Sequence, residues 1–234
     1  MTSPATPAPE QTAPGGVECP VCGGRFAAFE STGGREAAIC PGCSSRERHR
    51  ALWLLLQERL EMLQRARSLL HFAPEAFLQQ RFERLPGLRY ITADIDPGRG
   101  DLPLDLMDLK LPDACFEAVL CSHVLEHVPD DRLAMRELHR ILRPGGWAIV
   151  MVPLDVWRAE THEDPTITDP QDRLREFGQE DHVRLYGNDI GDRLRDAGFE
   201  VDEVAISESV GPERARTHGL LRSDHVFVCN KEPA

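Results

Sequence analysis

Four cysteines form the clearest pattern for metal chemistry in this sequence. Two C-x₂-C pairs are separated by seventeen residues, which places the thiols at Cys19, Cys22, Cys40 and Cys43. Four thiolates at this spacing complete the tetrahedron that zinc prefers and leave no position for substrate. We therefore predict a structural zinc ion in a zinc-ribbon-like module over residues 17–50. Two alternatives stay open: four unconnected free thiols, or a redox pair.

A basic stretch follows the last of these cysteines directly. Residues 44–50 read SSRERHR on a chain that is otherwise acidic. The stretch is a candidate site for an anion or a cofactor carboxylate. The alternative is a solvated helix start whose arginines offset the negative charge of a four-thiolate zinc site.

The bulk composition indicates an acidic chain with one main domain. It has 234 residues, a formal net charge of −12 and an odd number of cysteines, seven. The negative field disfavours nucleic acid and anionic membranes as partners, and no apolar run approaches the ~20 residues of a membrane span. Residues 1–16 are rich in Pro, Ala and Thr without the features of a secretory signal, so we expect a disordered tail and a cytoplasmic protein with reduced thiols.

The spacing of apolar residues predicts an α/β domain over residues 51–234. A leucine pattern over 52–63 predicts one amphipathic helix. Beyond it, short apolar runs that predict strands alternate with helical patterns, which indicates a mainly parallel sheet covered by helices. The expected strands are SLLHF, LRYITA, FEAVLCS, WAIVMV, FEVDEVAI and HVFVCN, and the expected helices between them include EAFLQQRFERL and DDRLAMRELHRIL.

Punctuating residues predict where several of these elements end. The helix DDRLAMRELHRIL is expected to stop at the RPGG that contains Pro144 and Gly145. Asn188 is expected to cap a helix that runs to Ala197. The polar stretch 157–186 has weak periodicity and is expected to be an insertion over the active face that contributes to the acceptor site.

The stretch SLLHFAPEAF, residues 68–77, has the outline of a strand that leads into a helix, but it contains no glycine. A second strand follows and ends in Asp94 and Asp96, about twenty residues downstream. In doubly wound folds, an acid at that position holds the hydroxyl groups of a nucleoside ribose. The order of strand, turn, helix, strand and acid is therefore intact without the usual glycines.

Residues 105–153 resemble the middle of class I S-adenosylmethionine-dependent methyltransferases. The resemblance rests on an Asp before a short LP segment, an FE strand that leads to LEHV, and a helix that ends in LRPGG. It extends more loosely from Ser68 to the C-terminus and does not cover the tail or the cysteine module. It implies a Rossmann-like, doubly wound fold with a seven-stranded, mainly parallel sheet, and S-adenosylmethionine as cofactor.

The resemblance also implies which residues hold the cofactor. Asp94 matches the acid that binds the ribose, Asp105 matches the acid that receives the adenine amino group, and Ser122 and His123 lie along the cofactor. The full set of expected cofactor-binding residues is His71, Ala73, Glu75, Asp94, Ile95, Asp105, Leu106, Ser122 and His123.

The opening turn departs from the family pattern, which has an Asp and a run of glycines there. A dinucleotide presents a pyrophosphate that needs bare backbone N–H groups, whereas S-adenosylmethionine carries a sulfonium and an ammonium. Glu75 would repel the first ligand and could pair with the ammonium of the second. The alternatives are an acid at a helix start for Glu75 and a core histidine for His71.

Methyl transfer from a sulfonium needs an aligned acceptor, and a base only where the acceptor must lose a proton. The candidates for a base are His182, which lies in the polar stretch, and His127 of LEHV, for which a structural role beside the cofactor is the stronger alternative. The leading function is methyl transfer to an oxygen or nitrogen of a small molecule, sugar or secondary metabolite. The alternatives are an RNA base methyltransferase that uses the zinc module to read RNA, and a non-catalytic zinc-dependent scaffold.

Overall fold

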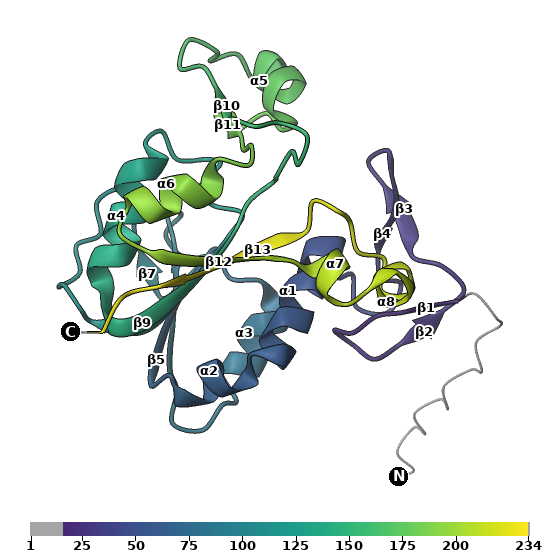
Figure 1. Ribbon diagram of the computed structural model, residues 1–234, viewed down its shortest axis with the longest axis horizontal. Coiled ribbons are helices and arrows are strands. Elements are labelled where there is room, and N and C mark those ends of the chain that lie inside the picture. Colours follow the sequence, from purple (N-terminus) through teal and green to yellow (C-terminus); the bar gives the residue numbers. More distant parts are fainter. Residues whose placement is uncertain (1–15, 234) are drawn as a thin grey trace. The chain divides into compact units, whose positions relative to one another are not determined.

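The computed structural model describes residues 16–233, so the expected tail lies almost wholly outside the described residues. These residues form two compact units (Figure 1). One contains residues 16–58 and 206–224, and the other contains residues 59–205 and 225–233. The N-terminal unit thus extends beyond the cysteine module that the sequence predicts, because it includes a helix and a C-terminal segment that is remote in sequence.

The N-terminal unit consists of two small antiparallel ribbons and three helices. The ribbons pair β1 with β2 and β3 with β4. The elements are β1 Val17–Glu18, β2 Arg25–Phe26, β3 Glu30–Thr32, β4 Arg35–Ile39, α1 Glu47–Glu58, α7 Ile206–Ser209 and α8 Pro212–Thr217.

Arg50 of α1 joins the parts of this unit, although the sequence places it in a basic surface stretch. Its side chain is fully buried. The guanidinium donates to Ala38 O and Ser45 O at 3.0 and 2.9 Å, and to His218 O and Gly219 O at 2.7 and 2.9 Å. Arg50 therefore satisfies buried carbonyls and does not contribute to a surface site for anions.

The larger unit contains the seven-stranded, mainly parallel sheet that the sequence predicts, and its strand order is β12-β13-β9-β8-β5-β6-β7. In this sheet β13 alone runs in the direction opposite to the other strands. The strands are β5 Ser68–Phe72, β6 Arg89–Asp94, β7 Leu102–Pro103, β8 Phe116–Ser122, β9 Leu142–Met151, β12 Glu200–Ala205 and β13 His225–Asn230. The short β7 is not predicted from the sequence.

Helices cover both faces of this sheet (Figure 1). On one face, α4 Asp131–Ile141 and α6 Ile190–Asp196 pack on alternate sheet residues such as Leu70, Val119 and Val150. On the other face lie α2 Leu60–Arg65 and α3 Ala76–Phe82, and the Phe82 ring lies 6.1 Å from the His71 ring of β5. This alternation follows from the two-residue period of a strand. No helix among residues 16–233 has the length and apolar character that crossing a bilayer requires.

Several predicted boundaries are wrong. The leucine pattern over 52–63 is split at Arg59 into α1 and α2, because Arg59 has φ −104° and ψ 29°. The helix α4 ends at Ile141, just before RPGG as predicted, but β9 begins earlier than the expected strand WAIVMV and includes RPGG. The first turn of α6 follows Asp189 and not Asn188, whose side chain instead donates to Val156 O.

The polar stretch predicted as an insertion contains short elements of its own. These are β10 His162–Glu163, α5 Pro170–Phe177 and β11 Arg184–Leu185, and β10 pairs with β11. Asp169 caps α5 by accepting from the backbone N–H groups of Gln171 and Asp172. Gly178 ends the helix at φ 85°, a conformation that glycine adopts without strain.

Asp224 makes the stability of the N-terminal unit depend on pH. Burial is the main cause that raises the pKa of its carboxyl to about 6, and the nearby Glu47 adds to the rise. The folded state therefore binds this proton more tightly than the unfolded chain, whose carboxyl has a pKa near 3.8. The resulting stabilisation is complete below the unfolded pKa and is lost as pH rises through the folded pKa.

The variant Asp224→Asn is expected to lack this loss, because the amide cannot ionise and can still accept from Leu221 N, which donates to the native carboxylate at 2.6 Å. Relative to the parent, its free energy of unfolding should rise by on the order of 2–3 kcal/mol between about pH 4 and pH 7, measured by urea unfolding. Zinc loss at low pH affects both proteins and cancels in the comparison. Parallel pH profiles would contradict the assignment.

Candidate functional site

A pocket of about 360 Å³ lies at the carboxyl ends of β5, β6 and β8. Phe72 and Ala73 line it from the end of β5, Asp94 from the end of β6, and His123 from the residue after β8. This edge of a parallel sheet is where doubly wound folds bind their ligands, and the volume suits a nucleoside-sized molecule. The pocket is therefore the candidate cofactor site.

Two residues at this edge have left-handed backbone conformations although neither is glycine. Ala73 has φ 46° and His123 has φ 55°. Each backbone N–H donates across the sheet, from Ala73 to Ala93 O and from His123 to Met151 O, both at 2.8 Å. Such conformations in non-glycine residues cost about 1–3 kcal/mol and gather at ligand sites. Alanine thus makes the turn for which the family uses glycine.

Acidic residues dominate the charge of the pocket. Arg99 is the single arginine among the lining residues. Four aspartates also line the pocket: Asp94, Asp96, Asp105 and Asp181. Asp94 accepts from Asp96 N and Asp105 accepts from Met107 N, each at 2.9 Å, so local turns orient both carboxylates. A pocket of this charge suits a cationic ligand and disfavours a phosphate.

The apolar part of the pocket includes two of the predicted residues. Leu106 lines it with only 3 % exposure, whereas Ile95 lines it and is 69 % exposed. An exposed large apolar side chain at a pocket rim suits a flat ring that would cover it.

The other predicted cofactor residues lie elsewhere. His71 is buried in β5, where its Nδ1 lies 2.8 Å from the Tyr90 hydroxyl and its Nε2 lies 2.7 Å from Glu75 Oε2. Neither His71 nor Glu75 lines the pocket. Ser122 is also buried, and its hydroxyl has no hydrogen-bond partner among residues 16–233. The expected contact of Glu75 with a cofactor ammonium stays a prediction, and here its carboxylate is engaged by His71.

Comparison with known proteins identifies the domain that holds this pocket. Residues 57–150 match the family model described as a methyltransferase domain. In this region the chain is similar to methyltransferase domains. It is 32 % identical over 117 residues to a probable S-adenosylmethionine-dependent methyltransferase of Mycolicibacterium smegmatis, a match that covers 50 % of this chain and 38 % of the relative. It is 31 % identical over 120 residues to the malonyl-[acyl-carrier protein] O-methyltransferase of Halorhodospira halophila, covering 50 % and 37 %.

The matches to these curated relatives cover only part of each protein. The chain spans less than two fifths of the length of either relative. Among solved structures, the cyclase SpnF has a TM-score of 0.52 at 16 % identity, with 92 % of this chain and 90 % of that chain covered. That similarity shows the fold alone, and a fold does not define the reaction it hosts.

The two predicted catalytic histidines lie together, and one of them lines the pocket. His127 lines the pocket, and its ring lies 4.8 Å from the His182 ring, nearly perpendicular to it. Burial is the main cause that lowers the pKa of His182, so this imidazole is neutral at neutral pH. The sequence thus identified two histidines that the fold brings together from positions fifty-five residues apart.

The sequence analysis missed Arg184, whose guanidinium attaches the loop of His182 to the loop of His127. Its Nη1 donates to Leu125 O and Val128 O at 2.8 and 2.5 Å, and its Nη2 donates to Pro129 O at 2.9 Å. Its Nε also pairs with Glu163 at 2.9 Å. Only 3 % of this side chain is exposed, and its hydrogen bond to Leu125 O is buried, so solvent cannot readily replace the guanidinium there.

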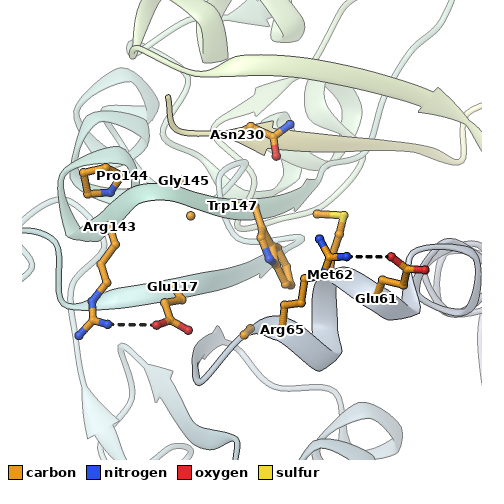
Figure 2. A pocket seen from close by; sticks show the side chains of 11 residues that line it. Glu61, Met62, Arg65, Glu117, Arg143, Pro144, Gly145, Trp147 and Asn230 are labelled. Carbon is orange, nitrogen blue, oxygen red and sulfur yellow. Dashed lines mark hydrogen bonds and ion pairs between the residues drawn. The ribbon is translucent and has the colours of Figure 1, made fainter. Parts of the chain in front are cut away.

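A second cavity of about 510 Å³ lies at the opposite edge of the sheet, near the starts of β8 and β9 and beside α2 (Figure 2). It is the larger of the two, but its charged groups pair with one another, Arg65 with Glu61 at 3.2 Å and Arg143 with Glu117 at 3.0 Å. It also lies at the strand ends opposite to those that bind ligands in this fold. We therefore assign the site to the smaller pocket.

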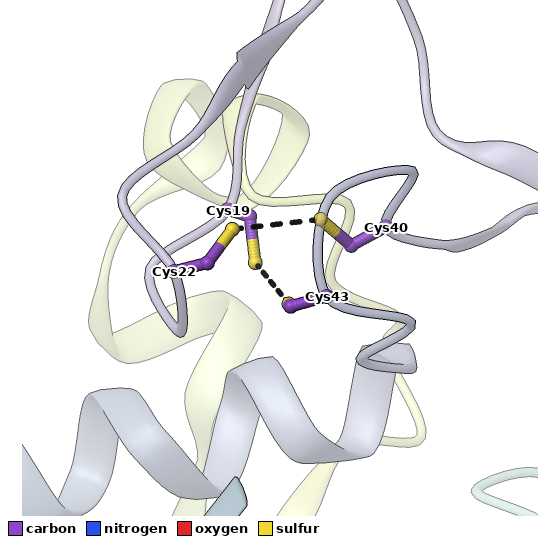
Figure 3. Close-up of side chains that lie close together, drawn as sticks. All are labelled: Cys19, Cys22, Cys40 and Cys43. Carbon is purple, nitrogen blue, oxygen red and sulfur yellow. Dashed lines mark hydrogen bonds between the residues drawn. The ribbon is translucent and has the colours of Figure 1, made fainter. Parts of the chain in front are cut away.

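The four predicted metal ligands converge in the N-terminal unit (Figure 3). Their sulfurs all lie within 4.8 Å of one another, with Cys19 3.7 Å from Cys43 and Cys22 3.8 Å from Cys40. Tetrahedral zinc with Zn–S bonds of about 2.3 Å requires sulfurs about 3.8 Å apart. The donor set and spacing therefore fit a zinc ion.

Two equivalent turns present these thiols. In each turn the first cysteine carbonyl accepts from the residue four positions later, Gly23 and Ser44, at 2.8 Å. Both residues have positive φ, 72° and 59°. The Phe26 ring packs against both turns, because a Cβ at Gly24 or Gly42 would lie within 2.7 Å of it. The sequence pattern identified the thiols but not this shared aromatic support.

We expect the purified chain to contain about one sulfur-bound zinc ion, which Cys40→Ser combined with Cys43→Ser should abolish. Elemental analysis, with the thiolate-to-cobalt absorption band after cobalt substitution, measures it. The matched control is Cys115→Ser, which removes a thiol of the other unit. Undiminished sulfur-bound metal in the double variant would exclude these ligands.

Removal of the Arg184 guanidinium should cost about 3 kcal/mol or more in free energy of unfolding, because Arg184→Met takes a nearly buried cation away from three carbonyls and from Glu163 at once. Arg195→Met is the matched control: it removes an arginine of α6 whose partner Asp192 and whose own side chain are both exposed, and it should cost less than about 0.5 kcal/mol. Urea unfolding of both variants tests this. Equal losses would show that the buried contacts of Arg184 carry no net stability.

Proposed function

We propose that this chain transfers the methyl group of S-adenosylmethionine to an oxygen or nitrogen of a small acceptor molecule. The observation that carries the proposal is an acid-lined pocket at the carboxyl ends of β5, β6 and β8 in a methyltransferase domain. When bound there, the cofactor supplies an electrophilic methyl group on a sulfonium.

Six of the lining residues have proposed roles in binding the cofactor. Asp94 accepts hydrogen bonds from the ribose hydroxyls, and Asp105 accepts one from the adenine amino group. Ile95 and Leu106 contact the faces of the adenine ring. The backbone of Ala73 and of His123 approaches the rest of the cofactor, which the left-handed conformation at each position supports.

The acceptor is proposed to enter on the side of His127 and His182. These two histidines lie beside the pocket, and both belong to loops rather than to the sheet. A relative named as an O-methyltransferase supports an oxygen acceptor, and the net charge of −12 supports a small molecule over a nucleic acid. The intact, acid-lined pocket argues against a scaffold with a decayed cofactor site.

The variant Asp94→Ala should bind S-adenosylmethionine tens-fold more weakly than the parent, since a charge-assisted pair of hydrogen bonds contributes about 2–3 kcal/mol. Asp94→Asn removes the negative charge but keeps the local turn, because its amide oxygen can still accept from Asp96 N. Asp108→Ala is the control, since that exposed carboxylate pairs with Lys110 and does not line the pocket. Calorimetric titration measures all four proteins.

Unchanged affinity in a folded Asp94→Ala protein would show that Asp94 does not hold the ribose. Activity is tested by release of S-adenosylhomocysteine during incubation with fractionated small molecules and, separately, with RNA. Release that depends only on RNA would overturn the small-molecule acceptor.

A further inference from the structure

Three side chains, of which one lines the cofactor pocket, form a cluster whose common geometry the methyl-transfer proposal does not explain. The ligand atoms of Glu126, His127 and His182 all lie within 4.8 Å of one another. Glu126 is only 1 % exposed, yet its Oε2 has no hydrogen-bond partner among residues 16–233. A buried carboxylate oxygen without a partner is costly, and an ion or water that satisfies it is the usual explanation.

Each of the two imidazoles is oriented by a contact at its Nδ1 atom. His182 Nδ1 donates to Phe177 O at 3.1 Å, because a carbonyl can only accept. His127 Nδ1 lies 3.2 Å from Asp181 Oδ2. Each contact places the ring proton on Nδ1 and leaves Nε2 as the nitrogen with a free lone pair. A hydrogen bond of this kind on the far nitrogen is the usual support of a metal-binding histidine.

The carboxylate is oriented in the same way. Glu126 Oε1 lies 3.1 Å from His123 Nδ1, which leaves Oε2 as the free oxygen. Val183 N donates to Glu126 O at 2.9 Å, so the backbone also ties the loop of Glu126 to the residue that follows His182. The three ligands therefore come from two loops that share direct contacts, with an outer partner for each.

We propose that Glu126, His127 and His182 bind a divalent transition-metal ion. Two imidazoles and one carboxylate are a ligand set for Zn²⁺, Fe²⁺ or Co²⁺ that leaves positions open for exogenous ligands. Because His127 lines the pocket, those positions face the place where the acceptor would meet the cofactor.

The ion would bind the acceptor through the oxygen or nitrogen that receives the methyl group, a part of the inference that rests on the proposed function. Binding to the ion lowers the pKa of a hydroxyl, so its proton can leave to solvent without a protein base. A coordinated Nε2 has no lone pair for a proton, so the metal replaces the general-base role that the sequence predicts for His182 and His127.

Titration of Co²⁺ into the zinc-loaded protein tests the site. The expected result is one additional cobalt per chain with visible d–d absorption and no thiolate-to-cobalt band in the near ultraviolet, because its ligands contain no sulfur. Glu126→Gln and His182→Gln should each weaken cobalt binding by ~100-fold or more, and Asp181→Asn, an outer partner, by about 10–100-fold. His225→Gln is the matched control, since this histidine also pairs with a glutamate, Glu203, outside the cluster, and it should change nothing.

Failure of this proposal is distinguishable from failure of the methyl-transfer proposal. Glu126→Gln should lose cobalt binding but keep its affinity for S-adenosylmethionine within a few-fold, whereas Asp94→Ala should do the reverse. The proposal is overturned if the parent protein binds no cobalt beyond the cysteine site, or if folded Glu126→Gln and His182→Gln bind it as tightly as the parent. Circular dichroism of each variant shows that it is folded.

Discussion

The geometry of the site depends on one buried guanidinium, that of Arg184. A guanidinium has five fixed donors, and away from water each donor needs an acceptor. Arg184 finds acceptors in Leu125 O, Val128 O and Pro129 O, the carbonyls that flank Glu126 and His127. It lies two residues after His182, so the same charge that fixes one loop also fixes the other. The mouth of the pocket therefore takes its shape from the need to satisfy this cation.

A buried arginine also links separate segments of the N-terminal unit. Arg50 is fully buried and donates to carbonyls of two segments, residues 37–45 and 218–219, that are far apart in sequence. The first of these segments contains Cys40 and Cys43, so the arginine helps to position the second pair of thiols. Neither arginine could be identified from the sequence, because their partners are backbone carbonyls and leave no pattern of residue types. Because backbone partners leave no mark in the sequence, an arginine in a basic stretch such as residues 44–50 is predicted to be exposed.

The sequence predicted most of the sheet because its signals are local. The strand FEAVLCS coincides with β8, and SLLHF coincides with β5. The sequence failed where a boundary depends on pairing between strands: RPGG joins β9 because Gly145 and Gly146 hydrogen-bond with Lys231 beyond β13. Spacing and family resemblance were enough to single out the cysteines that converge and the aspartates that line the pocket. The contacts of Glu126 with His123 and of Glu75 with His71 were not predicted, because they depend on the folded arrangement of the side chains.

The charges around the pocket explain together why the opening turn can dispense with glycine. Glycine lets a backbone approach a pyrophosphate closely, and an aspartate-lined pocket has little use for that approach because it repels phosphate. Ala73 keeps the left-handed turn at φ 46°, and its hydrogen bond to Ala93 O offsets part of the strain. A bound cofactor, with its sulfonium and ammonium, and a divalent ion at Glu126 would each bring positive charge to a region rich in carboxylates. The proposed cationic ligands would thus account both for an opening turn without glycine and for the buried, unpartnered oxygen of Glu126.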